Sequence, residues 1–494
     1  MRTYQLVHRL VLPSDLETAP GVLQAFPWTC ESISNLFDGK HRAQKESWDT
    51  VIAEYGGAVA VGRDKRANIV FPDEPSKTPK AFISPINSEI IEKTQVAWAL
   101  RTNHPLDPLL VVTHNRCIFV WDVGRQSLIG FLRGHGGLIT SIAVHPCSPN
   151  IFATTSADFT TRVYNLDILP QSPYPPHPRW RPWPGPSAAS AAQGFDTLAD
   201  QGSGIGRRIV LLAGGIYGGH LWDVLGAAFH PRLPLIATCG ADRYVKFWRC
   251  VPGQSMIRED KPIFSAKLSA ARIFSIAWLS DDLLMIHCGM AYAPSPDNPN
   301  SRASQDPNSE EESPLHYEKT VPARIVVFRW LGLQRFFPDG WTNDAIQHVR
   351  GISTDSQQSN SYTIISSLVL NPPNPPRHGE QQEWISNLGQ QNHPRLIFAY
   401  PDPALRTVEL TEMVTLQVPE ELEGVTRDIK RLRLESAASA TSASDQGLVH
   451  ISILGAEKLW KNRVLSAAAV TNAGDILVLD SRGNLWGMRR VHDK

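Results

Sequence analysis

The sequence predicts an all-β protein, a seven-bladed β-propeller, and three observations support this prediction. A phrase that begins with Gly-His and closes with His-Pro occurs at residues 134–146 and again at residues 219–231. Strand triplets with a common turn and a common ending recur along the chain. The first residues alternate between apolar and polar side chains like a strand, and this strand could be the fourth strand of the last blade. Internal repetition of this kind is typical of propellers and other repeat architectures.

Each triplet has two apolar strands, a turn that carries Asp or Asn, and a third strand that ends in a large side chain. In four copies the turn residue lies six positions before that side chain: Asn115 and Trp121, Asp158 and Tyr164, Asp242 and Trp248, Asp480 and Trp486. The predicted third strands end at Phe71, Trp121, Tyr164, Trp248, Phe328, Val408 and Trp486. The interval from Trp121 to Tyr164 matches a WD40 repeat of about 40–45 residues.

The longer intervals contain segments rich in Pro, Ser, Ala or acidic residues. Such segments bury too little apolar surface to fold alone, so we expect mobile surface loops. They lie at residues 169–207, 290–322, 371–393 and 435–447 of a single propeller that spans residues 1–494.

The start of the chain predicts how the ring closes. Residues 3–12, TYQLVHRLVL, alternate between apolar and polar side chains. We expect this strand to pair as the outer strand of the last blade, because the C-terminal triplet ends at Trp486 and pairing would protect the sheet edges.

The Gly-His phrase predicts a polar network inside the blades. A buried Asp accepts hydrogen bonds only and is costly without them, so each turn Asp needs donors. The predicted set in the first copy is His135, Ser141, Asp158 and Tyr164. The predicted set in the second copy is His220, Asp242 and Trp248, with Gly226 where a Ser would stand, so that we expect an incomplete network. These side chains are predicted to be structural rather than catalytic.

Composition and motifs argue against several functions. The 494 residues contain 48 Lys and Arg and 48 Asp and Glu, so no net field favours direct binding to nucleic acid or membranes. No transmembrane run, Walker loop, nucleophile elbow or metal-ligand spacing is found, and we expect no catalytic residues, cofactor or metal. The dense basic run at residues 427–435 indicates a solvated surface or a weak nuclear signal.

The order of motifs resembles a known family. It is similar to that of the Polycomb-group WD40 subunit known as extra sex combs or embryonic ectoderm development. The similarity lies in the opening residues 4–12, residues 133–167, residues 207–249 (RRIVLLAGGIYGGHLWDVLGAAFHPRLPLIATCGADRYVKFWR) and residues 264–289. The Gly-Gly lead-in to Gly-His is the more specific feature, and the resemblance is poor between residues 330 and 450.

This resemblance implies a non-catalytic, nuclear scaffold of a Polycomb repressive complex that takes part in silencing. The implied partners are a SET-domain histone methyltransferase, other subunits of the complex, and a histone tail peptide. In the family, one face carries an aromatic cage that holds trimethyl-lysine through cation–π attraction.

The sequence departs from the family at the cage. The four aligned positions are not aromatic here: Val22, Thr94, Ile364 and Ile365. Three aromatic residues are candidate substitutes, each with a plainer interpretation: Phe26 as core, Tyr362 as strand or loop, and Trp222 as a partner contact. We expect the scaffold role without recognition of the mark. The alternatives are another WD40 adaptor, such as a ubiquitin-ligase receptor or a different chromatin platform, and a propeller enzyme.

Overall fold

The protein is described by a computed structural model, and most of its described residues are strands. The described residues are 2–12, 21–74, 76–85, 94–169, 202–213, 218–250, 257–293, 319–338, 340, 359–370, 395–402, 407–414, 448–454, 465–471, 475–480 and 482–490.

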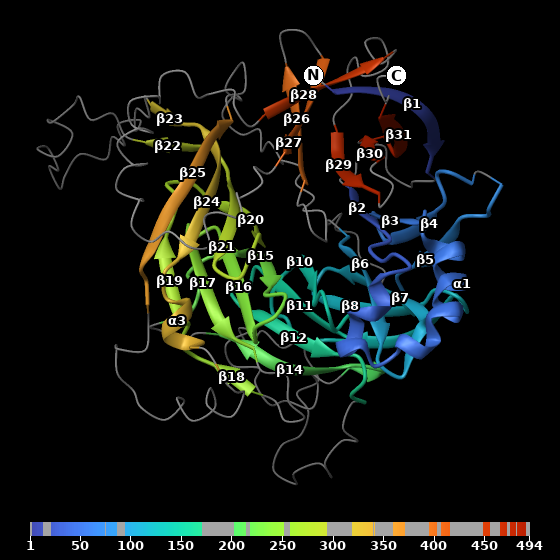
Figure 1. Ribbon diagram of the computed structural model, residues 1–494, viewed down its shortest axis with the longest axis horizontal. Coiled ribbons are helices and arrows are strands. Elements are labelled where there is room, and N and C mark those ends of the chain that lie inside the picture. The colour runs from blue at the N-terminus through green and yellow to red at the C-terminus, as the bar shows by residue number, and fades with distance from the viewer. Residues whose placement is uncertain are drawn as a thin grey trace, which may run out of the picture.

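Antiparallel sheets follow one another in chain order around a common centre, which gives the described residues a β-propeller-like arrangement (Figure 1). The sequence runs from blue sheets on the right, through green ones at the lower left, to orange and red strands at the top. Both ends of the chain lie at the top of this view. Among the described strands no sheet closes on itself.

Five sheets contain four or five strands each. The first has β2 (Gly21–Ala25), β3 (Val59–Arg63), β4 (Arg66–Val70) and β5 (Lys80–Ile83). The second has β6 (Val96–Arg101), β7 (His104–His114), β8 (Cys117–Asp122), β9 (Ser127–Leu132) and β13 (Ser203–Gly204). The third has β10 (Ile139–Val144), β11 (Ile151–Ser156), β12 (Thr161–Asn165), β14 (Arg207–Leu212) and β18 (Ile257–Glu259). The fourth has β15 (Val224–Phe229), β16 (Leu235–Gly240), β17 (Tyr244–Arg249) and β19 (Phe264–Lys267). The fifth has β20 (Ile273–Trp278), β21 (Leu283–Cys288), β24 (Ala323–Trp330) and β25 (Tyr362–Leu370).

The remaining large sheet has seven strands in the order β26-β27-β28-β1-β31-β30-β29. Their bounds are β26 (Arg395–Asp402), β27 (Thr407–Val414), β28 (Leu448–Leu454), β1 (Arg2–Val11), β31 (Asn484–Arg490), β30 (Ile476–Asp480) and β29 (Leu465–Val470). The triplets predicted to end at Val408 and Trp486 share this sheet, because β1 pairs antiparallel with β31 and parallel with β28.

Side chains reinforce the pairing of β1 with β31. The guanidinium of Arg9 donates to Oδ1 of Asn484 from Nη2 at 2.7 Å and from Nε at 3.1 Å. The same guanidinium lies over the ring of Trp486, 4.8 Å from its centroid. The N-terminal strand is therefore attached to the last triplet by backbone pairing, hydrogen bonds and a cation–π contact.

The second strands of the blades form the core. Every residue of β11 and of β16 is buried, because neighbouring sheets cover both faces of these strands. Their sequences, IFATTS and LIATCG, are accordingly apolar or small throughout rather than alternating. Because both faces of these strands are buried, their hydroxyl groups can form hydrogen bonds with other polar groups inside the protein.

A helical segment between β2 and β3 departs from the all-β prediction. Three short 3-10 helices, η1 (Ser32–Ser34), η2 (Leu36–Gly39) and η3 (Arg42–Gln44), lead into α1 (Lys45–Tyr55). Trp48, Val51 and Tyr55 lie on one side of α1 at helical spacing and are buried against the first sheet. The indole of Trp48 also donates to the carbonyl of Thr29 at 2.9 Å. A second short helix, α3 (Leu333–Phe336), follows β24.

Parts of the predicted inserts are described. Residues 203–204 form β13, which pairs with β9, and β22 (Ala291–Ala293) pairs with β23 (Lys319–Val321). The inserts at residues 371–393 and 435–447 lie outside the described residues. Within the described part of the chain no helix is long and apolar enough to cross a membrane.

Candidate interaction surface

A four-residue polar network connects a loop to the fourth sheet. Nδ1 of His220, in the loop before β15, lies 2.9 Å from Oδ2 of Asp242 in the β16–β17 turn. Nε2 of His220 lies 2.8 Å from Oγ1 of Thr238, and the indole of Trp248 donates to the same oxygen at 2.8 Å. The predicted gap at Gly226 is therefore wrong, because Thr238 on β16 completes the network from another strand.

The donors of this network fix its direction. A carboxylate only accepts and an indole N–H only donates, so Nδ1–H of His220 donates to Asp242 and the hydroxyl of Thr238 donates to Nε2. Burial lowers the pKa of His220, so the imidazole is neutral at pH 7. Burial alone raises the pKa of Asp242, but hydrogen bonds from His220 and from the backbone N–H groups of Tyr244 and Leu221 lower it overall.

The third sheet repeats the network with one change. Nδ1 of His135 lies 2.8 Å from Oδ2 of Asp158, and Nε2 lies 2.7 Å from Oγ1 of Thr154. Tyr164 stands where Trp248 does and stacks on Phe152 with the ring centroids 5.2 Å apart. Ser141 was predicted in the place that Thr154 holds, and that assignment is wrong. The register pairs Ser141 with Thr155, so its side chain lies on the opposite face from Thr154.

We expect Thr154→Val to lower the free energy of unfolding by about 1–2 kcal/mol, because Nε2 of the buried His135 loses its partner. Ser141→Ala is the matched control. Its partner Thr155 keeps a second hydrogen bond to Thr140, so the cost should stay below about 0.5 kcal/mol. Urea unfolding of both variants measures the difference, and equal costs would favour the original placement of Ser141.

The two other predicted pairs lie at turns whose contacts differ from those of the His–Asp networks. Asn115 adopts a left-handed backbone conformation with φ 55°, and its carbonyl accepts from the N–H of Ile139. Trp121 is half-buried on β8. Asp480 is completely buried and accepts from the indole of Trp486 at 3.3 Å and from the side-chain amide of Asn484 at 2.8 Å. In the last triplet the tryptophan therefore reaches the turn Asp directly.

The four cage-aligned positions do not form one site. Val22 is half-buried on β2 and packs against the first hydrophobic cluster. Thr94 is 1% exposed, and its hydroxyl donates to the carbonyl of Asp64. Ile364 and Ile365 are 50% and 55% exposed on β25, the outer strand of the fifth sheet. Thr94 is therefore inside the protein, Val22 is partly covered, and the two isoleucines are on the rim.

The candidate substitutes are also separated. Phe26 is buried in the core, edge-to-face with Trp28 and Trp98. Tyr362 is half-buried at the start of β25 and packs edge-to-face on Phe264 and Phe328. Trp222 alone among these three is largely exposed, at 63%.

Trp222 is one of a group of exposed apolar side chains that we call the loop face. It is defined by four exposed side chains beside the two His–Asp networks: Leu138, Phe159, Leu221 and Trp222. Leu138 and Phe159 flank the network of the third sheet, and Leu221 and Trp222 follow His220 in the fourth. The hydroxyl of Thr140 on β10 donates to the carbonyl of Val224 on β15, which holds the two sheets together here. Exposed apolar side chains on a fixed base are suited to binding another protein.

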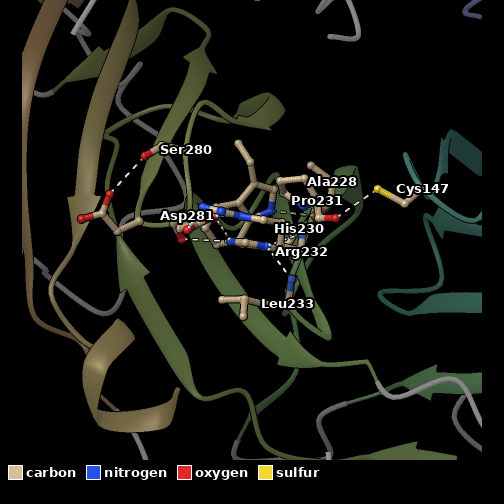
Figure 2. A network of polar contacts seen from close by, with 10 residues as sticks. Cys147, Ala228, His230, Pro231, Arg232, Leu233, Ser280 and Asp281 are labelled. Carbon is tan, nitrogen blue, oxygen red and sulfur yellow. Dashed lines mark hydrogen bonds and ion pairs between the residues drawn. The ribbon is translucent and has the colours of Figure 1, made fainter. Parts of the chain in front are cut away.

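A second polar network joins the sheets at the other end of these strands (Figure 2). His230, after β15, accepts at Nδ1 from the N–H groups of Arg232 and Leu233, and its Nε2 donates to the carbonyl of Asp281 at 3.0 Å. Arg232 and Asp281 form an ion pair, and the thiol of Cys147 donates to the carbonyl of Pro231 at 3.3 Å. Three consecutive sheets are thereby connected. No group of three or more His, Cys, Asp and Glu side chains suited to a metal is found in the described ranges.

Comparisons with known proteins agree with this arrangement. The WD domain, G-beta repeat family matches residues 126–165 and 214–249, which include most strands of the third and fourth sheets. A chain in the solved structure of the Chaetomium thermophilum Polycomb Repressive Complex 2 bound to GSK126 superposes with a TM-score of 0.54. That likeness covers 99% of each chain at 15% identity, so it concerns the fold alone.

Curated relatives include Polycomb proteins. Polycomb group protein FIE1 of Zea mays is 29% identical over 143 residues, 28% of this chain and 23% of that protein. Polycomb protein EED of Chaetomium thermophilum is 27% identical over 142 residues, 28% of this chain and 19% of that protein. Ribosome biogenesis protein ERB1 of Malassezia globosa is 30% identical over 166 residues, 29% of this chain and 18% of that protein. The chain spans about a fifth of the length of these relatives.

Proposed function

We propose that this protein is the β-propeller scaffold subunit of a Polycomb-type histone methyltransferase complex. The observation that carries the proposal is its likeness to two Polycomb proteins in different organisms, at 29% and 27% identity. The family's order of motifs supports it, as does the fold shared with a chain of Polycomb Repressive Complex 2. In this role the protein is not an enzyme: it holds a SET-domain methyltransferase and other subunits in the nucleus and contributes to silencing.

The proposed architecture has seven blades closed by the N-terminal strand. Five sheets supply one blade each, and the seven-stranded sheet supplies the other two, β26-β27-β28 and β29-β30-β31 with β1. The position of β1 between β31 and β28 supports this proposal, because one strand joins the last triplet to the preceding one. Shared strands of this kind protect the edges of a propeller.

The proposed scaffold does not recognise trimethyl-lysine. A cage requires two or more aromatic faces around one cation. Of the cage-aligned positions, Thr94 is buried, Val22 is half-buried against the first hydrophobic cluster, and Ile364 and Ile365 lie on a separate outer strand. Trp222 is exposed, and no ring contact between it and another described aromatic residue is found. This supports a role of Trp222 in binding another protein.

Two measurements on the tagged full-length protein test the proposal. We expect mass spectrometry of copurifying proteins to identify a SET-domain methyltransferase. We expect calorimetric titration with trimethyl-lysine histone-tail peptides to give no dissociation constant tighter than about 1 mM. Micromolar binding that Trp222→Ala abolishes would contradict the loss of the cage, and recovery of other partners without a methyltransferase would contradict the Polycomb assignment.

A second candidate is a WD40 adaptor in a different assembly. The 30% identity to a ribosome biogenesis protein over 166 residues favours it, because that match is as strong as the Polycomb ones. The same mass spectrometry distinguishes the two candidates by the partners recovered.

A further inference from the structure

Four exposed arginines lie in turns and loops at one end of the second to fifth sheets. They stand in the β7–β8 turn, in the loop from β9 to β10, in the β16–β17 turn and in the loop before β20, and we call them the turn arginines: Arg116, Arg133, Arg243 and Arg272. None of the four forms an ion pair with a carboxylate of the described residues. Their charges are therefore available to a binding partner.

Contacts of the second sheet place its two turn arginines together. The pairing of β8 with β9 aligns Ile118 with Leu132, so the residue two positions before the first and the residue after the second share one end of the sheet. The carbonyl of Asn115, in the β7–β8 turn, accepts from the N–H of Ile139 at the start of β10. This end of the second sheet therefore lies beside the start of the third.

The same end continues through the fourth and fifth sheets, whose inner strands β15 and β20 follow β10 near the centre (Figure 1). The hydroxyl of Thr140 on β10 donates to the carbonyl of Val224 on β15. A backbone N–H of the β16–β17 turn donates to the carbonyl of Asp223, directly before β15. A Cβ atom at Gly226 would lie 3.2 Å from the carbonyl oxygen of Phe274, near the start of β20. All four turn arginines thus belong to one face of the protein.

Arginines at the opposite end of these sheets are paired with carboxylates. Four such ion pairs are Arg101–Asp167, Arg125–Asp122, Arg232–Asp281 and Arg329–Asp282. At the end of the turn arginines, the side chains of Asp158 and Asp242 are only 3% exposed and are held by His135 and His220. The chain has equal numbers of acidic and basic residues, so this end is positive through the placement of charge rather than through its total.

The two His–Asp networks present strained residues at this face. Phe159 and Arg243 directly follow Asp158 and Asp242, and both have a left-handed backbone, with φ 67° and 71°. The N–H of the next residue donates to Oδ1 of the Asp in each turn, which stabilises this conformation. Both side chains are exposed. Strained residues other than glycine are typical of functional positions, so the turns present an aromatic ring and a guanidinium in equivalent places.

The loop face lies among the turn arginines. The carbonyl of Leu138 accepts from a backbone N–H of the β11–β12 turn, which carries Phe159. The N–H of Leu221 donates to Asp242, so Leu221 and the adjacent Trp222 lie beside the turn that carries Arg243. Exposed apolar side chains and unpaired positive charges are therefore interspersed on one face.

We propose that this face binds an acidic segment of a partner protein in which carboxylates alternate with apolar side chains. The turn arginines pair with the carboxylates, and the loop face takes the apolar side chains. The occupant is a peptide rather than a nucleic acid, because the exposed Leu138 and Leu221 offer no ring on which a base can stack. This inference goes beyond the Polycomb assignment and does not depend on it.

The test measures binding of two labelled peptides to the full-length protein by fluorescence anisotropy. One peptide alternates Glu and Leu, and the other has Gln in place of each Glu. We expect the Glu peptide to bind about ten times more tightly at low salt. That advantage should shrink as salt is added, because exposed charges are screened. Trp222→Ser should weaken the binding of both peptides by the same factor.

Paired variants show which end of the protein binds the peptide. Arg133→Gln combined with Arg243→Gln should lower the affinity for the Glu peptide about fivefold and leave the affinity for the Gln peptide unchanged. Arg42→Gln combined with Arg125→Gln removes two exposed arginines from η3 and the β8–β9 turn and is the matched control. All four side chains are exposed, so the melting temperatures should stay equal.

Three results would contradict the proposal. Equal binding of the Glu and Gln peptides would exclude recognition of the carboxylates. An equal loss of affinity in the control pair would show that the effect follows total charge rather than this face. A single-stranded DNA of similar length that binds more tightly than the Glu peptide would overturn the assignment to a protein segment.

Discussion

Asp242→Ala is expected to lower the free energy of unfolding by about 3 kcal/mol. The carboxylate accepts from Nδ1 of His220 at 2.9 Å, from the N–H of Tyr244 at 3.1 Å and from the N–H of Leu221 at 3.2 Å. Alanine leaves these donors without an acceptor in a buried place, and each orphaned donor costs on the order of 1 kcal/mol. His220 would also lose the group that orients it toward Thr238, so that the contact with Trp248 weakens too.

Urea unfolding measures this effect, and two variants make it specific. Asp242→Asn keeps an oxygen for the backbone N–H groups and should cost less than alanine. Asp260→Ala removes an exposed carboxylate that pairs with Arg258, and a surface ion pair of this kind contributes about 0–1 kcal/mol. If Asp242→Ala cost no more than Asp260→Ala, the network would not be what holds the turn to the fourth sheet.

The networks show what the sequence could and could not predict. The spacing of six residues between a turn Asp and an aromatic side chain placed Asp158, Tyr164, Asp242 and Trp248 correctly on their turns and third strands. It missed Thr154 and Thr238, although each stands four positions before its Asp. Irregular pairing in β10 and β15, after Ile139 and Val224, changes the face on which the following side chains lie. The spacing of residues along the sequence does not reveal this change of face.

The helix α1 and the cage positions were harder to predict, for different reasons. Trp48, Val51 and Tyr55 have helical spacing, but a single helix among many strand signals is weak information until its contact with the first sheet is known. The cage positions rested on alignment to a family rather than on the residues themselves. Ile364 and Ile365 lie on β25, whose place as an outer strand depends on pairing with β24. Long-range pairing of this kind is set by the whole fold.

The stability of the protein is expected to fall steeply as the pH decreases from about 6.5 to about 4. Burial lowers the pKa values of His145, His230 and His287 from 6.5 to about 4. Between these values the unfolded chain binds protons that the folded protein does not, so stability decreases as the pH falls. The stabilisation is fully present above pH 6.5, and each histidine contributes up to about 1.4 kcal/mol for each pH unit below it.

The contacts of His230 explain the direction of this effect. Its Nδ1 accepts from the N–H groups of Arg232 and Leu233, and a protonated ring could accept from neither. Protonation would therefore break the turn that joins the fourth sheet to Asp281 in the fifth. We expect His230→Asn to flatten the dependence on pH, because its side-chain oxygen can replace Nδ1 as the acceptor but does not titrate in this range. His104→Gln changes an exposed side chain and serves as the control. Urea unfolding at several pH values from 7.5 to 4.5 measures each slope, and an unchanged slope in His230→Asn would show that the acid sensitivity arises elsewhere.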